Sequence, residues 1–411
     1  MEVLVERAAG LDVHKKSVTV CVMTTDGRKV VKKLNRFSTF HRDLVLMREW
    51  LRMEQVTHVA MEATGEYWKP VYEILEGFFE VLVANAQHVK NVPGRKTDPE
   101  DAAWLARLLR HGLLEPSFVP DEAIRDLRDH TRMRRKTVDM ISRVENRTQK
   151  VLEASGIKIG SVVSDVFGMT GSAILGELAR NNTNPAALAE LARGSLKNKR
   201  EEIQRSLEGT FSAHDARLLK HQLDLHGQLE TRREAIEKEI ATMAVPYEAL
   251  VTRLDQMPGI NGTAAIEILG EIGADMSAWK EGRFIAAWAG LCPGNHESAG
   301  KRKQISTRKG NPFLKAILVQ AATAAVRKDG SYYQAKFRRL LVRRGYKRAI
   351  VAVAHSMLIA IYHMIRDGCD YKELGSEYLD RRSNEAKALA LAKQIERLGF
   401  HVGLKPIDAV N

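Results

Sequence analysis

Strand signals in this chain of 411 residues are confined to roughly the first 120 positions. Apolar and other residues alternate within residues 8–36, around a hairpin turn at "TTDGR", and predict three consecutive strands. Helices at 40–53 and 66–75 are then expected to alternate with short buried strands at 57–63 and 79–86. A strand meander followed by alternating helices and strands indicates a mixed α/β sheet, which we assign to a domain at residues 1–120.

The rest of the chain has helical patterns. Residues 121–250 predict a helical linker with one long polar helix. In this helix a row of residues, here called the seam, recurs at intervals of four and three positions. This seam either packs inside its own subunit or forms a coiled coil between two subunits, and the pattern leaves both open. A mainly α-helical domain is expected at 251–370, followed by a polar helical tail at 371–411. The seam consists of Leu218, Gln222, Leu225, Leu229, Arg232 and Ile236.

Composition narrows the class of partner. The formal net charge is +13, and a basic chain of this size usually meets a polyanion such as nucleic acid. No apolar run long enough to span a bilayer and no signal peptide is evident, so we expect no membrane partner. The three cysteines, Cys21, Cys292 and Cys369, stand far apart without a CxxC pair, which fits a reducing cytoplasm.

Four carboxylates in the first domain are candidate metal ligands. Asp12 ends the apolar first strand and Glu62 ends the fourth, where a charge is costly unless something compensates it. Asp98 and Asp101 lie three apart at the start of a helix predicted to run to about residue 114, so they share one helix face. Taken alone, Asp98 followed by Pro99 is better explained as a helix cap. The two strand-end acids shift the balance toward a metal site.

Clustered carboxylates repel one another, and some would stay protonated at neutral pH without a cation. Two Mg²⁺ ions balance four negative charges and prefer hard oxygen ligands. Two such ions about 4 Å apart clamp the attacking and leaving oxygens of a phosphodiester. Mn²⁺ is expected to substitute. The pattern therefore predicts a two-metal site for phosphodiester chemistry.

The segments "GLDVHKKSVTV", "MEATGEYW" and "KTDPEDAAWLARLL" resemble the DEDD motif of RuvC-like domains with the RNase H fold. More narrowly, they are similar to the transposases of insertion-sequence family one-ten (IS110), its one-eleven-eleven branch included. The resemblance covers about the first 115 residues. It implies that Asp12, Glu62, Asp98 and Asp101 are the catalytic metal ligands. Sugar kinases and actin-like ATPases also begin with an Asp on a hairpin, but they need a glycine soon after it, and here "VHKKS" follows.

Three nearby residues are not chosen as ligands. Glu66 lies beyond the strand end, and Glu100 points to another face of its helix. His14 is better explained by local packing or by a phosphate contact than by metal binding.

Two features of the third domain predict contacts with nucleic acid. "MPGING" resembles a helix–hairpin–helix element in which Gly259 and Gly262 permit a tight turn, although an ordinary turn between helices has the same pattern. Between Lys301 and Arg348 there are fifteen Lys and Arg against one acid, Asp329, which favours a phosphate-binding surface. The residues singled out are Lys301, Arg302, Lys303, Arg308 and Lys309.

Ser298 is a candidate nucleophile because of the family resemblance. On its own, a serine in a loop is usually only a loop residue. "GLCPGNHESAGK" fits the "GLxP…SxGK" pattern that carries a nucleophilic serine in the same transposases, with Glu297 and Ala299 where smaller residues are usual. Ser306 and Thr307 are the next candidates. Attack by serine would keep the energy of the broken phosphodiester, and metal ions would activate the hydroxyl, since no partner base is evident.

The expected function is a DNA transposase or recombinase that acts on double-stranded element ends and target DNA in the prokaryotic cytoplasm, at the nucleoid. The resemblance also implies a bridge RNA as guide and a homo-oligomer, dimer or tetramer, with a shared active site. The basic helix that contains Arg134 and Arg135 is the expected RNA contact. The alternatives are a RuvC-like structure-specific endonuclease that hydrolyses branched DNA without a covalent intermediate, and a non-catalytic nucleic-acid scaffold.

Overall fold

The computed structural model describes residues 3–26, 29–63, 65–84, 89, 101–294, 297–298, 301–302 and 307–403, with the backbone alone described at 26, 297–298, 301–302, 380–387 and 390. Contacts divide the chain into two compact units, Met1–Val119 and Pro120–Asn411. Each unit buries hydrophobic clusters of its own. The finer division of the second unit at residues 250 and 370 stays a prediction.

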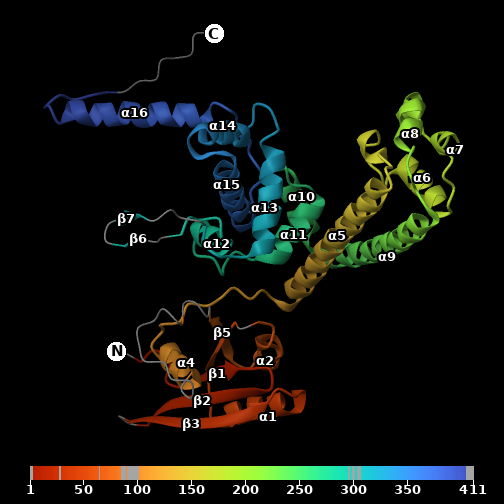
Figure 1. Cartoon of the computed structure of the whole chain (residues 1–411). Coiled ribbons are helices and arrows are strands. Elements are labelled where there is room, and N and C mark those ends of the chain that lie inside the picture. The colour runs from red at the N-terminus through yellow and green to blue at the C-terminus, as the bar shows by residue number, and fades with distance from the viewer. Residues whose placement is uncertain are drawn as a thin grey trace. The chain divides into compact units, whose positions relative to one another are not determined.

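The first unit contains a five-stranded mixed sheet with the strand order β3-β2-β1-β4-β5 (Figure 1). β2 pairs antiparallel with both β1 and β3, whereas β1, β4 and β5 run parallel. The mixed sheet predicted from the sequence is confirmed, and it is consistent with an RNase H-like transposase domain. The strands are β1 (Ala8–Val13), β2 (Ser17–Asp26), β3 (Lys29–Ser38), β4 (His58–Glu62) and β5 (Glu80–Ala84).

Helices cover both faces of this sheet. One face packs against α1 (His41–Met53) and α2 (Trp68–Leu75), whose apolar side chains join those of β1, β2, β4 and β5 in one core. The other face packs against α4 (Asp101–Arg110). Because successive residues of a strand point to opposite faces, β1, β2, β4 and β5 contribute to both layers, whereas most of β3 is exposed.

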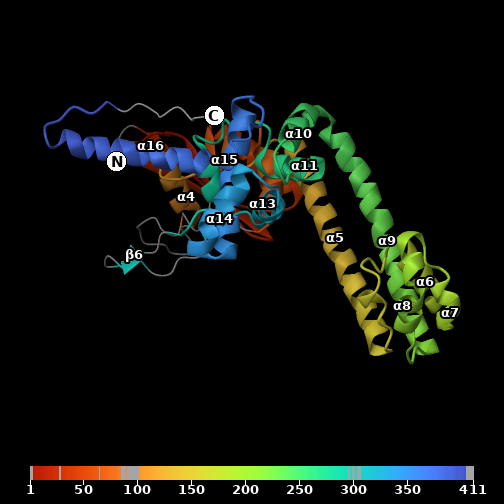
Figure 2. The same cartoon turned by 90° about the horizontal axis from the view of Figure 1, so that it is seen from above.

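Two long helices form an arm in the second unit. α5 (Glu122–Ala154) and α9 (Ala213–Ala244) lie side by side in both views and run antiparallel, since Ile124 and Leu127 meet Ile236 and Ile240 at one end (Figures 1 and 2). Three shorter helices pack around a separate core beyond the other end. These are α6 (Met169–Ala179), α7 (Pro185–Ala189) and α8 (Arg200–Ser206), with 3-10 turns at Ile159–Ser161 and Gly194–Lys199.

The α9 seam predicted from the sequence is partly used within the chain. Ile236 is 4% exposed against α5, as the within-subunit alternative requires. Leu218 and Leu225 keep 41% and 38% of their surface exposed. The buried residues of α9 are Ala216, Leu219, Ile236, Ile240 and Ala244, of which only Ile236 belongs to the predicted seam. A coiled coil between subunits stays a prediction.

The remainder of the second unit is mostly helical, and α15 is its central helix. α10 and α11 are joined by the "MPGING" turn, and α15 packs among α12, α13 and α14. β6 (Glu297–Ser298) and β7 (Lys301–Arg302) form a small hairpin. The helices are α10 (Glu248–Asp255, after a 3-10 turn at Val245–Tyr247), α11 (Gly262–Ile272), α12 (Gly282–Trp288), α13 (Pro312–Ala325), α14 (Tyr332–Arg344), α15 (Tyr346–Arg366) and α16 (Tyr378–Glu396).

The expectation that no apolar run is long enough to span a bilayer needs correction. Among the described residues, one helix, α15, passes that test by length and composition. His355 and Ser356 interrupt the run and hide it in the sequence. In the structure, 56% of its apolar window is buried inside the protein, and Val353, Met357 and Ile361 are fully buried. α15 therefore serves as the core helix of this bundle.

Candidate active site

Asp12 and Glu62 lie beside each other at one edge of the sheet. β1 and β4 pair in parallel up to Leu11 opposite Met61, so the next residues along the two strands are Asp12 and Glu62. Leu11 and Met61 belong to the core beneath α1 and α2. Because side chains alternate, the two carboxylates project toward the opposite face, the one covered by α4. The two acids therefore lie at the ends of neighbouring strands.

The N-terminus of α4 lies at the same edge. Gly10 is the closest contact point, because a Cβ added there would lie 2.1 Å from the Ala102 carbonyl oxygen and 2.4 Å from the Ala106 nitrogen. α4 then runs back along the strand, and its Arg110 carbonyl accepts bonds from the Leu4 and Val5 amides at 2.8 and 3.1 Å. Asp101, the first residue of α4, therefore lies toward the end of β1 that carries Asp12.

This arrangement supplies oxygen donors of the type that Mg²⁺ prefers. Asp12 keeps 24% of its side chain exposed, and its Oδ2 lies 3.0 Å from Nε2 of His14. Within the described residues, no three acidic, His or Cys side chains are close enough together to hold a metal ion. Asp98 lies outside those residues. Coordination by all four acids thus stays a prediction, supported by the donor set and its placement.

The acids set aside in the sequence behave as ordinary surface groups where they are described. Glu66 is 79% exposed and forms an ion pair with Lys69 at 2.7 Å. Glu100 lies outside the described residues. His14 was expected to pack locally or to face a phosphate; its side chain is 67% exposed, and its contact with Asp12 was not predicted.

Ser298 lies in the β6–β7 hairpin, where its backbone pairs with that of Lys301. Lys303 and Ser306 lie outside the described residues. Thr307, the other runner-up nucleophile, lies at the base of the segment 293–307 that carries Ser298, which we call the serine loop. Its backbone bridges to Pro293, and its Oγ1 accepts a bond from Lys315 at 2.6 Å.

The base of the serine loop is closely packed. Gly290 has φ +70°, and a Cβ there would lie 2.9 Å from the Arg308 carbonyl oxygen and 3.0 Å from the Gly310 nitrogen. The Arg308 amide donates to the Cys292 carbonyl at 3.1 Å. The glycine of the "GLCP" motif is thus required by the crossing of two chain segments.

Models of known protein families match both the region of the acidic residues and the region of the serine loop. A transposase model for the DEDD domain of the IS110 family matches residues 9–156. A second model, described as Transposase IS116/IS110/IS902 family, matches residues 251–338. Together they span more than half of the chain. They include Asp12 and Glu62 at the edge of the sheet and Ser298 in the serine loop. The chain belongs to the IS110 family of transposases.

Three relatives are also named as transposases. A probable family 20 transposase of Pseudomonas aeruginosa is 25% identical over 331 residues, covering 79% of this chain and 88% of the relative. The putative transposase y4pF/y4sB of Sinorhizobium fredii is 32% identical over 126 residues, 29% of this chain and 32% of its own. The putative transposase y4qE of the same organism is 26% identical over 249 residues, 59% and 52% of the two chains.

A buried charge cluster in this transposase was missed by the sequence analysis. Glu271 of α11 is 1% exposed, and its two oxygens accept bonds from Nε and Nη2 of Arg132 at 2.7 Å each. Arg128 contributes a second guanidinium at 3.8 Å, and burial lowers its pKa to about 10. Asn311, which caps α13 just after the serine loop, donates to Glu271 Oε2 at 2.5 Å. The sequence does contain one signal of this cluster, which is the acid Glu271 within the apolar run "AAIEILGEIG".

Arg134 and Arg135, predicted RNA contacts, are engaged inside the transposase. Arg134 pairs with Glu237 of α9 at 2.8 Å and with Glu267 of α11 at 3.2 Å. Arg135 also pairs with Glu267, at 3.6 Å. Glu267 is buried enough that desolvation raises its pKa, while the two arginines oppose that shift. These arginines connect the arm to α11, and an RNA contact there stays a prediction.

The "MPGING" turn is fixed mainly by packing. Gly259 has φ +84°, and a Cβ there would lie 2.2 Å from the Ala321 carbonyl oxygen of α13. Asn261 caps α11 by accepting a bond from the Ala264 amide at 2.9 Å. Gly262 is the first residue of α11, where an added Cβ would meet only Val251 at 3.9 Å. Gly259 thus has a structural role, and a helix–hairpin–helix contact with DNA stays a prediction.

Proposed function

We propose that this transposase breaks and rejoins DNA at element ends and target through a covalent phosphoserine intermediate on Ser298. Asp12, Glu62, Asp98 and Asp101 would hold the Mg²⁺ ions. The observation that carries the proposal is the convergence of Asp12, Glu62 and the N-terminus of α4 on one edge of the sheet. Membership of the IS110 family adds support, since both matched regions carry one part of the proposed machinery.

The chemistry balances without an external energy source. The Ser298 hydroxyl oxygen forms a bond to phosphorus, the bond from phosphorus to one deoxyribose oxygen breaks, and the serine proton ends on that leaving oxygen. A free DNA hydroxyl reverses the step on a new strand and releases the serine. Bound Mg²⁺ would lower the pKa of the attacking hydroxyl and neutralise charge that develops on the phosphate.

The protein's own residues would bind and orient the DNA. Arg308 and Lys309 are exposed beside the base of the serine loop, where they can neutralise phosphates. Lys301 and Arg302 belong to the same hairpin as Ser298, and Lys303 follows them in sequence. Gly259 and Gly262 flank backbone amides at the start of α11 that would face a phosphate group.

The guide and the assembly are part of the proposal. A bridge RNA would pair with target and donor DNA, and a homo-oligomer, dimer or tetramer, would bring the acids of one subunit to the serine of another. The support is family membership together with the net charge of +13. Sequencing the nucleic acid that co-purifies tests the guide, because a single discrete short RNA is expected and random fragments would contradict it.

The decisive experiment looks for a protein–DNA adduct that survives denaturation. Purified protein is incubated with element-end DNA and Mg²⁺, and the adduct is measured on a denaturing gel. Ser298→Ala and Asp12→Ala should each abolish it, as should chelation of the metal. Ser161→Ala and Asp224→Ala, at exposed serine and acid positions of the second unit, are matched controls that should keep it.

The remaining outcomes separate the alternatives. DNA cut with no attached protein would support the hydrolytic endonuclease. Binding without cutting would support the scaffold. An adduct that persists in Ser298→Ala would place the nucleophile elsewhere, with Thr307 tested next.

A further inference from the structure

We propose that a tyrosine-lined cavity between α14, α15 and the segment 369–374 binds one unpaired nucleotide of a single-stranded nucleic acid. The proposal rests on the proposed function in one respect, namely that nucleic acid is the substrate of this chain. The cavity has a volume of about 490 Å³, which is within the range of small-molecule sites. It lies away from the serine loop in sequence, and none of its lining residues is assigned to the active site.

The cavity is formed by a chain segment that folds back over two packed helices. Lys336 of α14 hydrogen-bonds to Ser356 of α15 and so fixes the two helices together. After α15 ends, the chain returns across their surface, where the Tyr371 amide donates to Gln256 at 3.1 Å and Asp370 pairs with Arg253 at 3.4 Å. The walls are therefore held by contacts to α10 as well as to each other.

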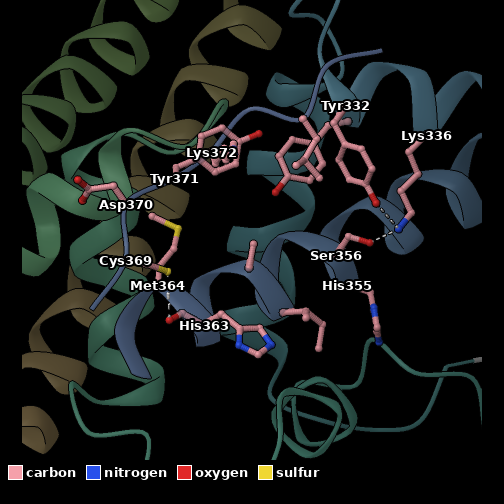
Figure 3. A pocket seen from close by; sticks show the side chains of 14 residues that line it. Tyr332, Lys336, His355, Ser356, His363, Met364, Cys369, Asp370, Tyr371 and Lys372 are labelled. Atoms are coloured by element: carbon pink, nitrogen blue, oxygen red, sulfur yellow. Dashed lines mark hydrogen bonds between the residues drawn. The ribbon is translucent and has the colours of Figure 1, made fainter. Parts of the chain in front are cut away.

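Tyrosine rings occupy one side of the cavity (Figure 3). Tyr333 is 2% exposed and supports its neighbours, with ring centroids 5.4 Å from Tyr332 and 6.3 Å from Tyr371. Tyr332 and Tyr371 are half-buried, and both are oriented by Glu373, which accepts from the Tyr332 amide at 2.9 Å and the Tyr371 hydroxyl at 3.1 Å. Rigid, partly exposed aromatic rings are the usual stacking platform for an unpaired base.

The opposite side is formed by α15 and presents apolar groups and two histidines. Ile359, Ala360 and Met364 line it together with His355 and His363. Burial, with a smaller contribution from Lys336, lowers the pKa of His355, so its imidazole is neutral near pH 7. A neutral imidazole can donate to or accept from the edge of a base, and the Ser356 hydroxyl, which donates to the Ala352 carbonyl and accepts from Lys336, can accept one further bond.

Cations among the lining residues match a phosphate group. Lys336 has its Nζ 3.5 Å from the Tyr332 hydroxyl, beside the aromatic side, and Lys372 lies on the returning segment. Asp370 is the one acid among the residues that line this described cavity, and its carboxylate pairs with Arg253. Stacking rings, neutral hydrogen-bonding groups and cations in one concave site fit a nucleotide better than an apolar ligand or a metal ion.

A stacked nucleotide here requires an unpaired strand, because bases in a duplex are already stacked on each other. The site would therefore hold a base released from DNA during strand exchange, or an unpaired base of an RNA. Both sources share the same chemistry, and the experiment separates them.

Photocrosslinking tests the site directly. Full-length protein freed of co-purifying nucleic acid is irradiated with single strands of about 12 nucleotides, a length typical of one binding site, that contain 5-iodo-deoxyuridine or 5-iodouridine. Peptide mapping should locate the crosslink on Tyr332 or Tyr371. A duplex of the same sequence should crosslink there far less. The more reactive of the two strands identifies DNA or RNA as the source.

Binding measurements with variants complete the test. Tyr371→Ala should weaken single-strand binding by about tenfold, as expected for loss of one stacking ring, while Tyr371→Phe keeps the ring and should bind normally. Tyr346→Ala removes an exposed tyrosine outside the cavity and is the matched control. Thermal unfolding checks that each variant is folded. A folded Tyr371→Ala protein that binds single strands as well as wild type, or crosslinks confined to other residues, would overturn the proposal.

The outcome is separable from that of the proposed function. If wild-type protein forms the Ser298 adduct but the tyrosines do not crosslink, the nucleotide site fails and the transposition chemistry stands. If the tyrosines crosslink but no adduct forms, the site stands without that chemistry.

Discussion

Arg132 and Glu271 form a bidentate ion pair, 139 residues apart in the sequence, with both N···O distances at 2.7 Å. Glu271 is 1% exposed, and Arg132 also lies over the ring of Phe313 at 4.5 Å. The pair joins the arm helix α5 to α11, and through Asn311 it reaches the first turn of α13. The position of the arm is thus coupled to the segment that follows the serine loop.

We predict that Glu271→Ala destabilises the second unit by about 3 kcal/mol, because removing one partner leaves buried arginine charge uncompensated. The measurement is the denaturant midpoint followed by circular dichroism. Glu230→Ala, which breaks the more exposed pair with Arg233, should cost under about 1 kcal/mol. Equal shifts in the two variants would show that the buried pair contributes no more than a surface pair.

Gly10→Ala should displace α4 from the sheet, because the added Cβ would lie 2.1 Å from a backbone oxygen of α4. Cys21 reports the displacement. Its thiol is 0% exposed, packs against Ala102 and Ala106, and has a pKa raised by burial, so in wild type it should resist alkylation. The variant should label Cys21 many times faster and lose the DNA adduct.

A matched control for that test is Gly77→Ala, where φ is +81° but nothing lies within 4 Å of an added Cβ. It should strain the backbone locally and leave Cys21 protected. Exposed Cys369 should label rapidly in every variant and serves as the internal standard. Protection of Cys21 in Gly10→Ala would mean that α4 accommodates the extra methyl group.

Local patterns were enough to predict the mixed sheet and to place acidic residues at strand and helix ends. Alternation along the first strand indicates which face Asp12 takes. These steps depend on short-range periodicity, which a single sequence displays directly. The parallel pairing that brings Glu62 beside Asp12 joins residues about 50 positions apart and is seen only in the structure.

Long-range contacts could not be predicted in the same way. Arg134 and Arg135 are basic residues of the kind that bind phosphates, but their partners Glu237 and Glu267 lie more than one hundred residues further along the chain. The tyrosine cavity likewise needs the chain to return after α15. A sequence shows where charge is, whereas only the fold shows which charges are already paired.

Gly259→Ala should lower stability more than Gly330→Ala, although both glycines have positive φ, +84° and +69°. Each substitution costs about 1–2 kcal/mol from the left-handed backbone conformation. Gly259 carries an additional steric cost, since its Cβ would meet the Ala321 oxygen at 2.2 Å, whereas Gly330 has nothing within 4 Å. Thermal unfolding of the two variants measures the difference. Equal melting temperatures would show that α13 moves aside at little cost.

The stability of the second unit should fall as the pH decreases below about 6.5, partly because of His355. Burial, helped by Lys336, lowers the pKa of this histidine in the folded protein. Between the folded and unfolded pKa values the unfolded chain binds more protons, so the stabilisation is present above about 6.5 and is lost as the pH falls through the lower folded value. His355→Gln should flatten this part of the profile, measured as urea midpoints from about pH 8 to about pH 5. His221→Gln, at an exposed position of α9, controls for the substitution itself. A profile in His355→Gln as steep as in wild type would assign the acid sensitivity to other groups.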